Sequence, residues 1–174
     1  MKRTTSCTTI LVTILLVSCA KQQYLDPTYG YYLEFPSGML LTPTEDGLIG
    51  QHPNNDSQLL FFVRETDASS LDEYLETLDP DMMSVAKRTE AEMDGAEAVN
   101  LIYSFNLAAD DDGRAPMAAG SGNADFDISQ YISVHEGKAY HAECFSSPHN
   151  FEVYCFTHFD LLMKTFRFQA PSDG

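Results

Sequence analysis

The histidines are the first residues in this chain that could bind a metal ion. The chain has five of them, and imidazole nitrogens are common ligands of zinc. A fold could bring several together with neighbouring glutamates. No pair matches the HxxxH or HExxH spacing, so exposed polar positions are the commoner explanation. The candidates are His135, His141, His149 and His158, with Glu136 and Glu143 beside them.

The aspartates between positions 110 and 127 offer the oxygen ligands that calcium prefers. Consecutive aspartates cannot all point inward toward one ion, and their spacing does not match an EF-hand loop. A solvated run of charges is the simpler interpretation, so we expect no bound metal and no other cofactor. The residues concerned are Asp110, Asp111, Asp112, Asp125 and Asp127.

Residues that could act as nucleophiles or acid-base pairs are poorly placed for catalysis. Ser121 stands between Gly120 and Gly122, but the strand-turn-helix pattern of a nucleophile elbow is missing around it. Glu90 and Glu92 share one face of an expected strand, which brings like charges together without distinguishing an acid from a base. We therefore expect no enzymatic activity and assign no catalytic residue.

Cys19 has the clearest chemistry in the chain. Lys2 and Arg3 precede the apolar run 10–17, a pattern typical of an export signal and too short to cross a bilayer. The run ends in Leu-Val-Ser-Cys, which resembles a bacterial lipobox, where the cysteine thiolate is alkylated by diacylglycerol before cleavage. We predict a lipoprotein signal peptide over 1–18 and acylation of Cys19, palmitate included. An ordinary cleaved signal with a chance cysteine is the alternative.

The predicted lipid also predicts a location. Two or three acyl chains anchor a protein stably, whereas one binds only marginally. Ala20 and Lys21 follow the cysteine, so the aspartate that signals inner-membrane retention in enteric bacteria is missing. We expect a lipid-anchored protein of the cell envelope, on the periplasmic face of the outer membrane if the source has two membranes.

Two cysteines remain for the folded domain once Cys7 leaves with the signal and Cys19 is acylated. Cys144 and Cys155 would then lie in a compartment that permits disulfides, and we predict that they pair. Closing a loop of this length contributes about 3 kcal/mol to stability. Two buried free thiols are the alternative, and neither cysteine belongs to a CxxC redox motif.

The charge of the chain limits its partners. It carries 26 acidic residues against 10 basic ones, a net charge of −16. Cleavage after residue 18 removes Lys2 and Arg3 and makes the charge more negative. Such a domain repels nucleic acid and anionic headgroups, so we expect no nucleic-acid partner, and the lipid must supply the membrane attachment. An acidic surface also serves solubility.

The elements that would position these residues are clearest from 128 onward. The runs 128–134 and 138–145 flank His135-Glu136-Gly137 and predict a β-hairpin. Apolar side chains then recur three and four residues apart, which predicts an amphipathic helix lying over that hairpin. These side chains are Phe151, Tyr154, Cys155, Phe159, Leu162, Met163 and Phe166.

The first part of the chain predicts short antiparallel strands and one helix. A capping box at Ser70 and Glu73 opens a helix over 71–78. The consecutive apolar residues of 59–63 predict a central strand. The other expected strands are 29–35, 39–42, 48–51, 87–93 and 97–105. The segments expected around this domain of 29–168 are a tether over 19–28, a long acidic and glycine-rich loop over 107–127, and a tail over 169–174.

Four short motifs follow one another in a characteristic order: 30–38, 70–75, 137–140 and 159–168. In that order the chain resembles the PsbP-like superfamily, which contains photosystem II extrinsic subunits, the Mog proteins that bind the Ran GTPase, and many bacterial lipoproteins. The resemblance implies an α+β domain, built as an α/β/α sandwich with a mostly antiparallel sheet and helices on both faces. The chain departs from the pattern in its longer acidic loop and in having Met39 where a tryptophan is expected.

Two functions are compatible with these features. The first is a membrane-anchored, non-catalytic lipoprotein that binds an envelope protein or helps to assemble a complex. It predicts a filled core and an exposed apolar patch or groove. The alternative is a small-molecule or metal carrier, which predicts an aromatic pocket with converging polar groups.

Overall fold

The computed structural model describes residues 21–53, 56–80, 83, 86–107 and 124–168. The strands are β1 (Gln22–Leu25), β2 (Tyr31–Phe35), β3 (Leu40–Pro43), β4 (Gly47–Gln51), β5 (Gln58–Glu65), β6 (Lys87–Met93), β7 (Ala96–Leu107), β8 (Ala124–His135), β9 (Lys138–Ser146) and β10 (Arg167–Phe168). The helices are α1 (Leu71–Leu75), α3 (Pro148–Phe151), the π-helix η1 (Glu152–His158) and α4 (Phe159–Met163).

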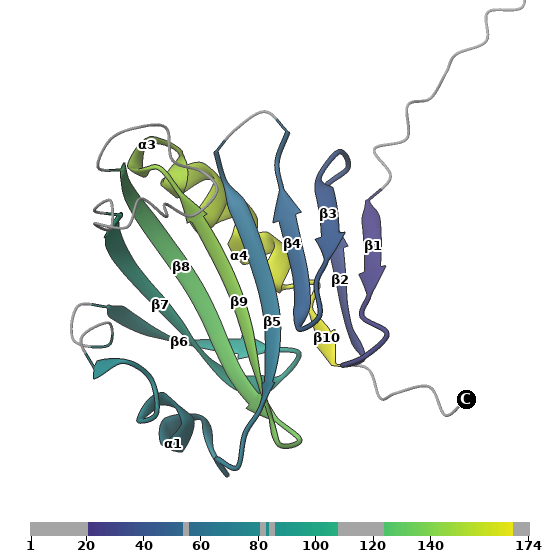
Figure 1. The fold of residues 1–174 in the computed structure, drawn as a ribbon, viewed down its shortest axis with the longest axis vertical. Coiled ribbons are helices and arrows are strands. Elements are labelled where there is room, and N and C mark those ends of the chain that lie inside the picture. The colour runs from purple at the N-terminus through teal and green to yellow at the C-terminus, as the bar shows by residue number, and fades with distance from the viewer. Residues whose placement is uncertain (1–20, 54–55, 81–82, 84–85, 108–123, 169–174) are drawn as a thin grey trace, which may run out of the picture.

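The strands form two sheets in which every described pairing is antiparallel (Figure 1). The larger sheet has seven strands in the order β3-β4-β5-β9-β8-β7-β6, and the smaller has three in the order β1-β2-β10. The α+β class and the mostly antiparallel sheet are therefore confirmed.

The hairpin of β8 and β9 lies near the middle of the larger sheet. Its two turn residues, Glu136 and Gly137, have φ angles of 49° and 72°, as in the turn that matches the right-handed twist of the two strands. The strand β8 begins at Ala124, so the last residues of the predicted loop 107–127 belong to the sheet. Residues 108–123 of that loop lie outside the described residues.

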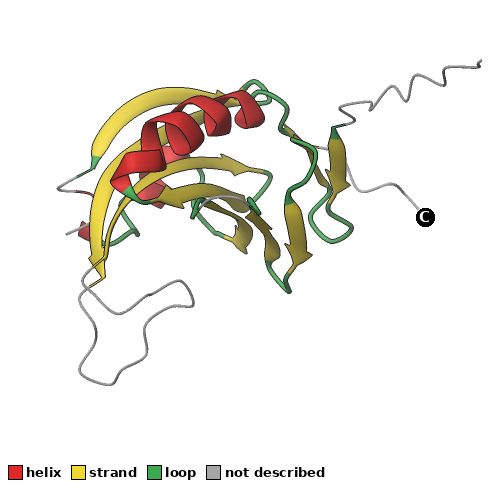
Figure 2. Ribbon diagram, turned by 90° about the horizontal axis from the view of Figure 1, so that it is seen from above, coloured by secondary structure: helices red, strands yellow, loops and turns green. Residues whose placement is uncertain are grey.

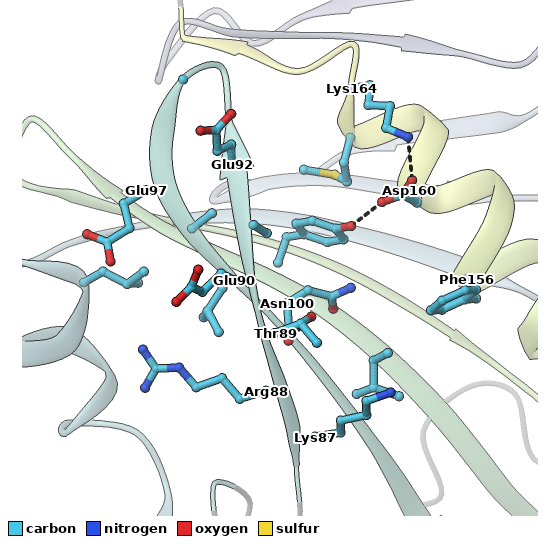
Figure 3. Close-up of a pocket in the computed structure, with 18 of the residues that line it drawn as sticks. Lys87, Arg88, Thr89, Glu90, Glu92, Glu97, Asn100, Phe156, Asp160 and Lys164 are labelled. Carbon is cyan, nitrogen blue, oxygen red and sulfur yellow. Dashed lines mark hydrogen bonds and ion pairs between the residues drawn. The ribbon is translucent and has the colours of Figure 1, made fainter.

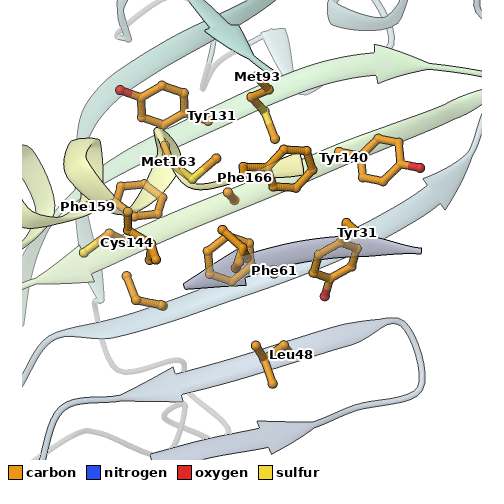
Figure 4. Packing of buried hydrophobic residues seen from close by; sticks show 14 of the residues in the cluster. Tyr31, Leu48, Phe61, Met93, Tyr131, Tyr140, Cys144, Phe159, Met163 and Phe166 are labelled. Atoms are coloured by element: carbon orange, nitrogen blue, oxygen red, sulfur yellow. The ribbon is translucent and has the colours of Figure 1, made fainter. Parts of the chain in front are cut away.

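The segment α3, η1 and α4 crosses one face of the larger sheet (Figure 2). Its inner side chains are buried, as their spacing predicted; Phe159 and Cys155 are each 1% exposed. The Phe159 ring packs at 5.6 Å from Tyr131 on β8 and at 6.3 Å from Phe61 on β5. Figure 4 shows these side chains meeting in one core.

The smaller sheet joins the same core. Tyr31 of β2 stacks on Phe166 at 5.9 Å, and Phe35 meets Phe61 edge-on at 5.8 Å. The strands β1 and β10 were not predicted. Since β1 lies inside the predicted tether 19–28, the folded domain begins at Gln22 and not at Tyr29.

The short helix α1 packs against part of the opposite face of the larger sheet. Its Leu71, Tyr74 and Leu75 are buried in a second apolar cluster with residues of β7, β8 and β9. As the capping box predicted, Ser70 Oγ accepts a hydrogen bond from the Glu73 N–H at 3.2 Å. The helix has five residues, fewer than the predicted 71–78, and the described residues show no helical layer on this face. The predicted α/β/α sandwich, with helices on both faces of the sheet, is therefore not supported.

The edges of the larger sheet are formed by β3 and β6. The edge strand β6 carries charged side chains at Lys87, Arg88, Glu90 and Glu92, and β3 ends in Pro43. Charged side chains and proline discourage a second strand from pairing with a free edge. In the described part of the chain, no helix is long and apolar enough to cross a membrane.

Candidate functional site

The C-terminal helical segment carries large apolar side chains on its outer side as well as on its inner side. Val153 is 49% exposed, Phe156 53% and Leu161 55%. We call these three residues the outer apolar row. Isolated exposed leucines are ordinary on protein surfaces, but three large apolar side chains on one short helical segment are typical of a surface that contacts another molecule.

The π-helix η1 carries the middle of this row. Its wider turn is visible in the backbone, because the Phe159 N–H donates to the Tyr154 carbonyl, five residues back in place of the usual four. The Thr157 hydroxyl also donates to the Glu152 carbonyl at 3.0 Å. Within η1, Cys155 is buried while its neighbour Phe156 is exposed.

An open groove lies beside the outer apolar row, between the helical segment and the strands β6 and β7. It has a volume of about 1210 Å³. Figure 3 shows Phe156, Asp160 and Lys164 extending from the helical segment on one side of the groove, with Thr89 and Asn100 on the strands. The groove is therefore lined by polar and apolar surface in about equal measure, with an exposed aromatic ring among its lining residues.

A fixed polar group lies on the helical side of the groove. Asp160 accepts a hydrogen bond from the Tyr131 hydroxyl at 2.7 Å, and its other carboxylate oxygen lies 2.8 Å from Lys164 Nζ. Burial acts to raise the pKa of Asp160, but the hydrogen bonds from Lys164 and Tyr131 outweigh it, so the pKa lies below its usual value. Asp160 is therefore ionised at neutral pH and holds the two side chains in place.

A second polar cluster lies on the α1 face of the larger sheet. The Tyr74 hydroxyl lies 2.7 Å from His141 Nε2, and Gln130 Nε2 lies 3.2 Å from His141 Nδ1. Gln130 Nε2 also donates to Glu143. Burial lowers the pKa of His141 to about 3, aided by the charge of Arg64. Burial raises the pKa of Glu143 to about 7, against the opposing influence of Arg64 and Gln130. His141 is therefore neutral under ordinary conditions.

The disulfide between Cys144 and Cys155 is present, with the two Cα atoms 5.2 Å apart. It joins β9 to η1 and so fastens the helical segment to the sheet below it. Cys19, the predicted lipidation site, lies outside the described residues.

The candidate metal ligands do not converge. His135 stacks on Phe168 at 4.1 Å, whereas His141 is buried beneath α1 against Tyr74. His158 contacts Tyr154, with ring centroids 5.4 Å apart. Among the described residues no group of three or more histidine, cysteine or acidic side chains could hold a metal ion. The other three candidates, His149, Glu136 and Glu143, lie in α3, in the β8–β9 turn and in β9.

The other candidates are also separated. Asp127 accepts a hydrogen bond from Ser104 at 2.6 Å across the β7–β8 pair, and Asp125 lies in β8. Glu90 and Glu92 lie on the edge strand β6. The aspartates 110–112 and Ser121 lie outside the described residues.

An apolar hollow beneath the helical segment is small. It has a volume of about 50 Å³ between Met39, Leu59, Cys144 and Phe159. Pockets for organic ligands usually measure several hundred Å³, so this hollow does not supply the aromatic pocket that a small-molecule carrier requires.

Comparison with known proteins identifies the fold. No protein-family model matches the sequence, and no curated protein does. The solution structure of cyanobacterial PsbP (CyanoP) from Synechocystis sp. PCC 6803 superimposes with a TM-score of 0.56, covering 94% of this chain and 98% of that one at 13% identity.

This chain has a PsbP-like fold. A crystal structure from Bacteroides thetaiotaomicron is also similar to this PsbP-like domain, with a TM-score of 0.59 at 8% identity. That match covers 87% of this chain but 49% of the other, so the chain spans about half the length of that protein. At such low identities these likenesses describe the fold alone.

The sequence did not locate the outer apolar row or the groove, although the protein-binding hypothesis predicted an exposed apolar patch or groove. The row was detectable, because Val153, Phe156 and Leu161 are large apolar residues lying off the stripe that was assigned to the core. The groove was not detectable, since it depends on how far β6 and β7 lie from the helical segment.

Proposed function

We propose that this chain is a non-catalytic, lipid-anchored protein of the cell envelope that binds another protein or helps to assemble a protein complex. The observation that carries the binding part is the outer apolar row beside an open groove. Covering a large apolar side chain that is half exposed contributes about 1 kcal/mol or more, so contact with a partner is favourable at this face.

The shape of the site supports a protein partner over a small ligand. The row lies on the exposed side of a helical segment, and the groove beside it is open and lined by both polar and apolar side chains. A partner that places an apolar side chain against Phe156 and polar groups along β6 would cover both features. The net negative charge disfavours nucleic acid as the partner.

The anchoring part of the proposal is supported by the sequence. The predicted export signal over 1–18 is followed by Cys19, the last residue of a lipobox-like motif. Diacylglycerol on that cysteine would place the protein on a membrane, and the residues that follow it favour the periplasmic face of the outer membrane where the source has two membranes.

A photo-crosslinking experiment in native membranes tests the binding function. Benzoylphenylalanine replaces Phe156 in one variant and Leu25 in the control; these positions are 53% and 56% exposed and lie on different elements. We expect a discrete protein adduct from position 156 and none from position 25. Adding Val153→Asp and Leu161→Asp should abolish the adduct. Equal adducts from both positions, or none from position 156, would refute a partner on this face.

Metabolic labelling with palmitate tests the anchor. The wild-type protein should incorporate the label, and Cys19→Ala should lose it together with sedimentation in the membrane fraction. Cys7→Ala, which alters the signal but not the modified residue, should keep both. Label retained by Cys19→Ala would show that this cysteine is not the acylated residue.

A further inference from the structure

The first strand begins very close to the proposed lipid. The strand β1 starts at Gln22, three residues after Cys19. A fully extended chain spans at most about 3.6 Å per residue, so the two Cα atoms can lie no more than about 11 Å apart. An acyl group on Cys19 would therefore hold the folded domain directly at the membrane surface, without a long flexible tether.

The start of β1 is fixed at one end of the molecule. Gln22 pairs with Phe35, the last residue of β2, and Lys21 Nζ lies 2.7 Å from Glu34. The chain turns there and begins β3 at Leu40, which is 59% exposed. Figure 1 shows the start of β1 and the β2–β3 turn at the same end of the molecule.

The opposite ends of these strands are acidic. The β3–β4 turn carries Glu45 and Asp46, and the neighbouring strand β5 ends at Glu65. These carboxylates lie near one another: the pKa of Tyr29 is raised first by burial and then by the charges of Asp46, Asp26, Glu65 and Glu45. Anionic headgroups repel such a cluster.

We propose that the mature protein stands on the membrane with the start of β1, the β2–β3 turn and Leu40 against the lipid headgroups, and with the end that carries Glu45, Asp46 and Glu65 directed away from the membrane. This orientation rests on the proposed lipid anchor. It leaves the outer apolar row and the groove accessible from the side, where a membrane-bound partner can reach them.

The absence of tryptophan provides a direct test, because the chain contains none. Two variants each carry one tryptophan. Leu40→Trp places it at the start of β3, and Glu45→Trp places it in the β3–β4 turn. Both positions are exposed. The full-length acylated protein is reconstituted in vesicles of phosphatidylethanolamine and phosphatidylglycerol, and its fluorescence is compared with and without brominated lipids.

We expect bromine to quench Leu40→Trp several-fold more strongly than Glu45→Trp. A Gly-Ser linker inserted between Ala20 and Lys21 should weaken the quenching of Leu40→Trp, because the domain is then free to leave the surface. Equal quenching of both indoles, stronger quenching at position 45, or no effect of the linker would overturn the orientation.

Mass spectrometry of the same samples separates the two proposals. If the intact mass includes the acyl groups and the quenching pattern is absent, the orientation is wrong while the anchor stands. If the mature protein lacks the acyl groups, the anchor is wrong and the orientation falls with it.

Discussion

At the scale of single residues, the most unusual group is the polar cluster beneath α1. His141 contacts three elements: Tyr74 of α1, Gln130 of β8 and the Phe62 ring of β5, on which it stacks at 4.5 Å. A polar group so deeply buried destabilises a fold unless its hydrogen bonds are made. The cluster therefore fixes the position of α1 on the sheet, and it keeps the carboxyl group of Glu143 in an unfavourable environment.

Glu143→Gln should remove a pH-dependent loss of stability. The pKa of Glu143 is raised from 4.5 to about 7 by burial, so its contribution to stability is complete below the unfolded value and is lost as the pH rises through the folded value. Relative to the variant, the wild-type protein should lose about 2 kcal/mol between about pH 5 and about pH 8, a figure reduced for partial exposure. Urea denaturation across this range measures the difference.

Glu136→Gln in the same hairpin is the matched control, because the Glu136 side chain is 77% exposed. Its stability should follow that of the wild-type protein at every pH. The opposing contribution of His141 is present in all three proteins and cancels in the comparison. Parallel stability curves for wild type and Glu143→Gln would contradict the assignment.

The residue scale also marks the limit of what the sequence could predict. The pairing of Cys144 with Cys155 followed from counting cysteines and from the compartment. The contact between Tyr74 and His141 joins residues 67 positions apart, and it depends on the register of β5, β8 and β9. No local pattern in the sequence carries that register, so His141 was considered as a metal ligand and not as a partner of α1.

At the scale of elements, the helical segment and its disulfide hold the fold together. Its inner side chains fill the space between the two sheets, and the link from Cys155 to Cys144 lies among them, fully buried. The outer apolar row can therefore stay exposed without weakening the core, because other side chains of the same segment form the core.

Removing the disulfide should destabilise the protein without changing its fold. The bridge closes a sequence separation of 11 residues, which corresponds to about 3 kcal/mol on the chain-entropy estimate. The double variant Cys144→Ala and Cys155→Ala should lose about that amount in urea denaturation while keeping its far-ultraviolet circular dichroism. Wild-type protein reduced with dithiothreitol should show a similar loss. A reduced protein as stable as the oxidised one would show that the bridge does not contribute.

Helices and strands were predictable where one face is buried, because apolar residues then recur at a regular spacing in the sequence. The spacing of Cys155, Phe159 and Leu162 marked the helical segment, and alternation marked β2. The strand β1 has no such pattern, because its side chains are largely exposed and it is held by backbone pairing with β2. The strand β10 has two residues and exists because the end of the chain returns to β2. The capping box marked where α1 begins, but nothing in the sequence marked so early an end.

At the scale of the whole molecule, charge is the dominant feature. The chain has a net charge of −16, and several carboxylates gather near Tyr29, in the turn that follows β1. Mutual repulsion among like charges destabilises a compact state, and mobile ions screen it over a distance of about 10 Å at 0.1 M salt. The stability of the folded domain should therefore depend on ionic strength.

Raising sodium chloride from about 0.05 M to about 0.5 M should raise the midpoint of thermal unfolding by a few degrees, because screening relieves the repulsion. Differential scanning calorimetry measures the shift. Potassium chloride at the same concentrations should have the same effect, since screening does not depend on the identity of the cation. A midpoint that falls with salt would mean that the described ion pairs, such as Arg88 with Asp72, outweigh the repulsion.

The edge strands of the larger sheet, β3 and β6, matter when many copies of the protein lie close together. Proteins attached to a bilayer diffuse in two dimensions and meet one another far more often than free ones, so an open β-edge would invite polymerisation into ribbons. The charges of β6 and the terminal proline of β3 oppose that pairing. If the proposed lipid anchor crowds copies of this chain on a membrane, these edges would oppose their assembly into ribbons.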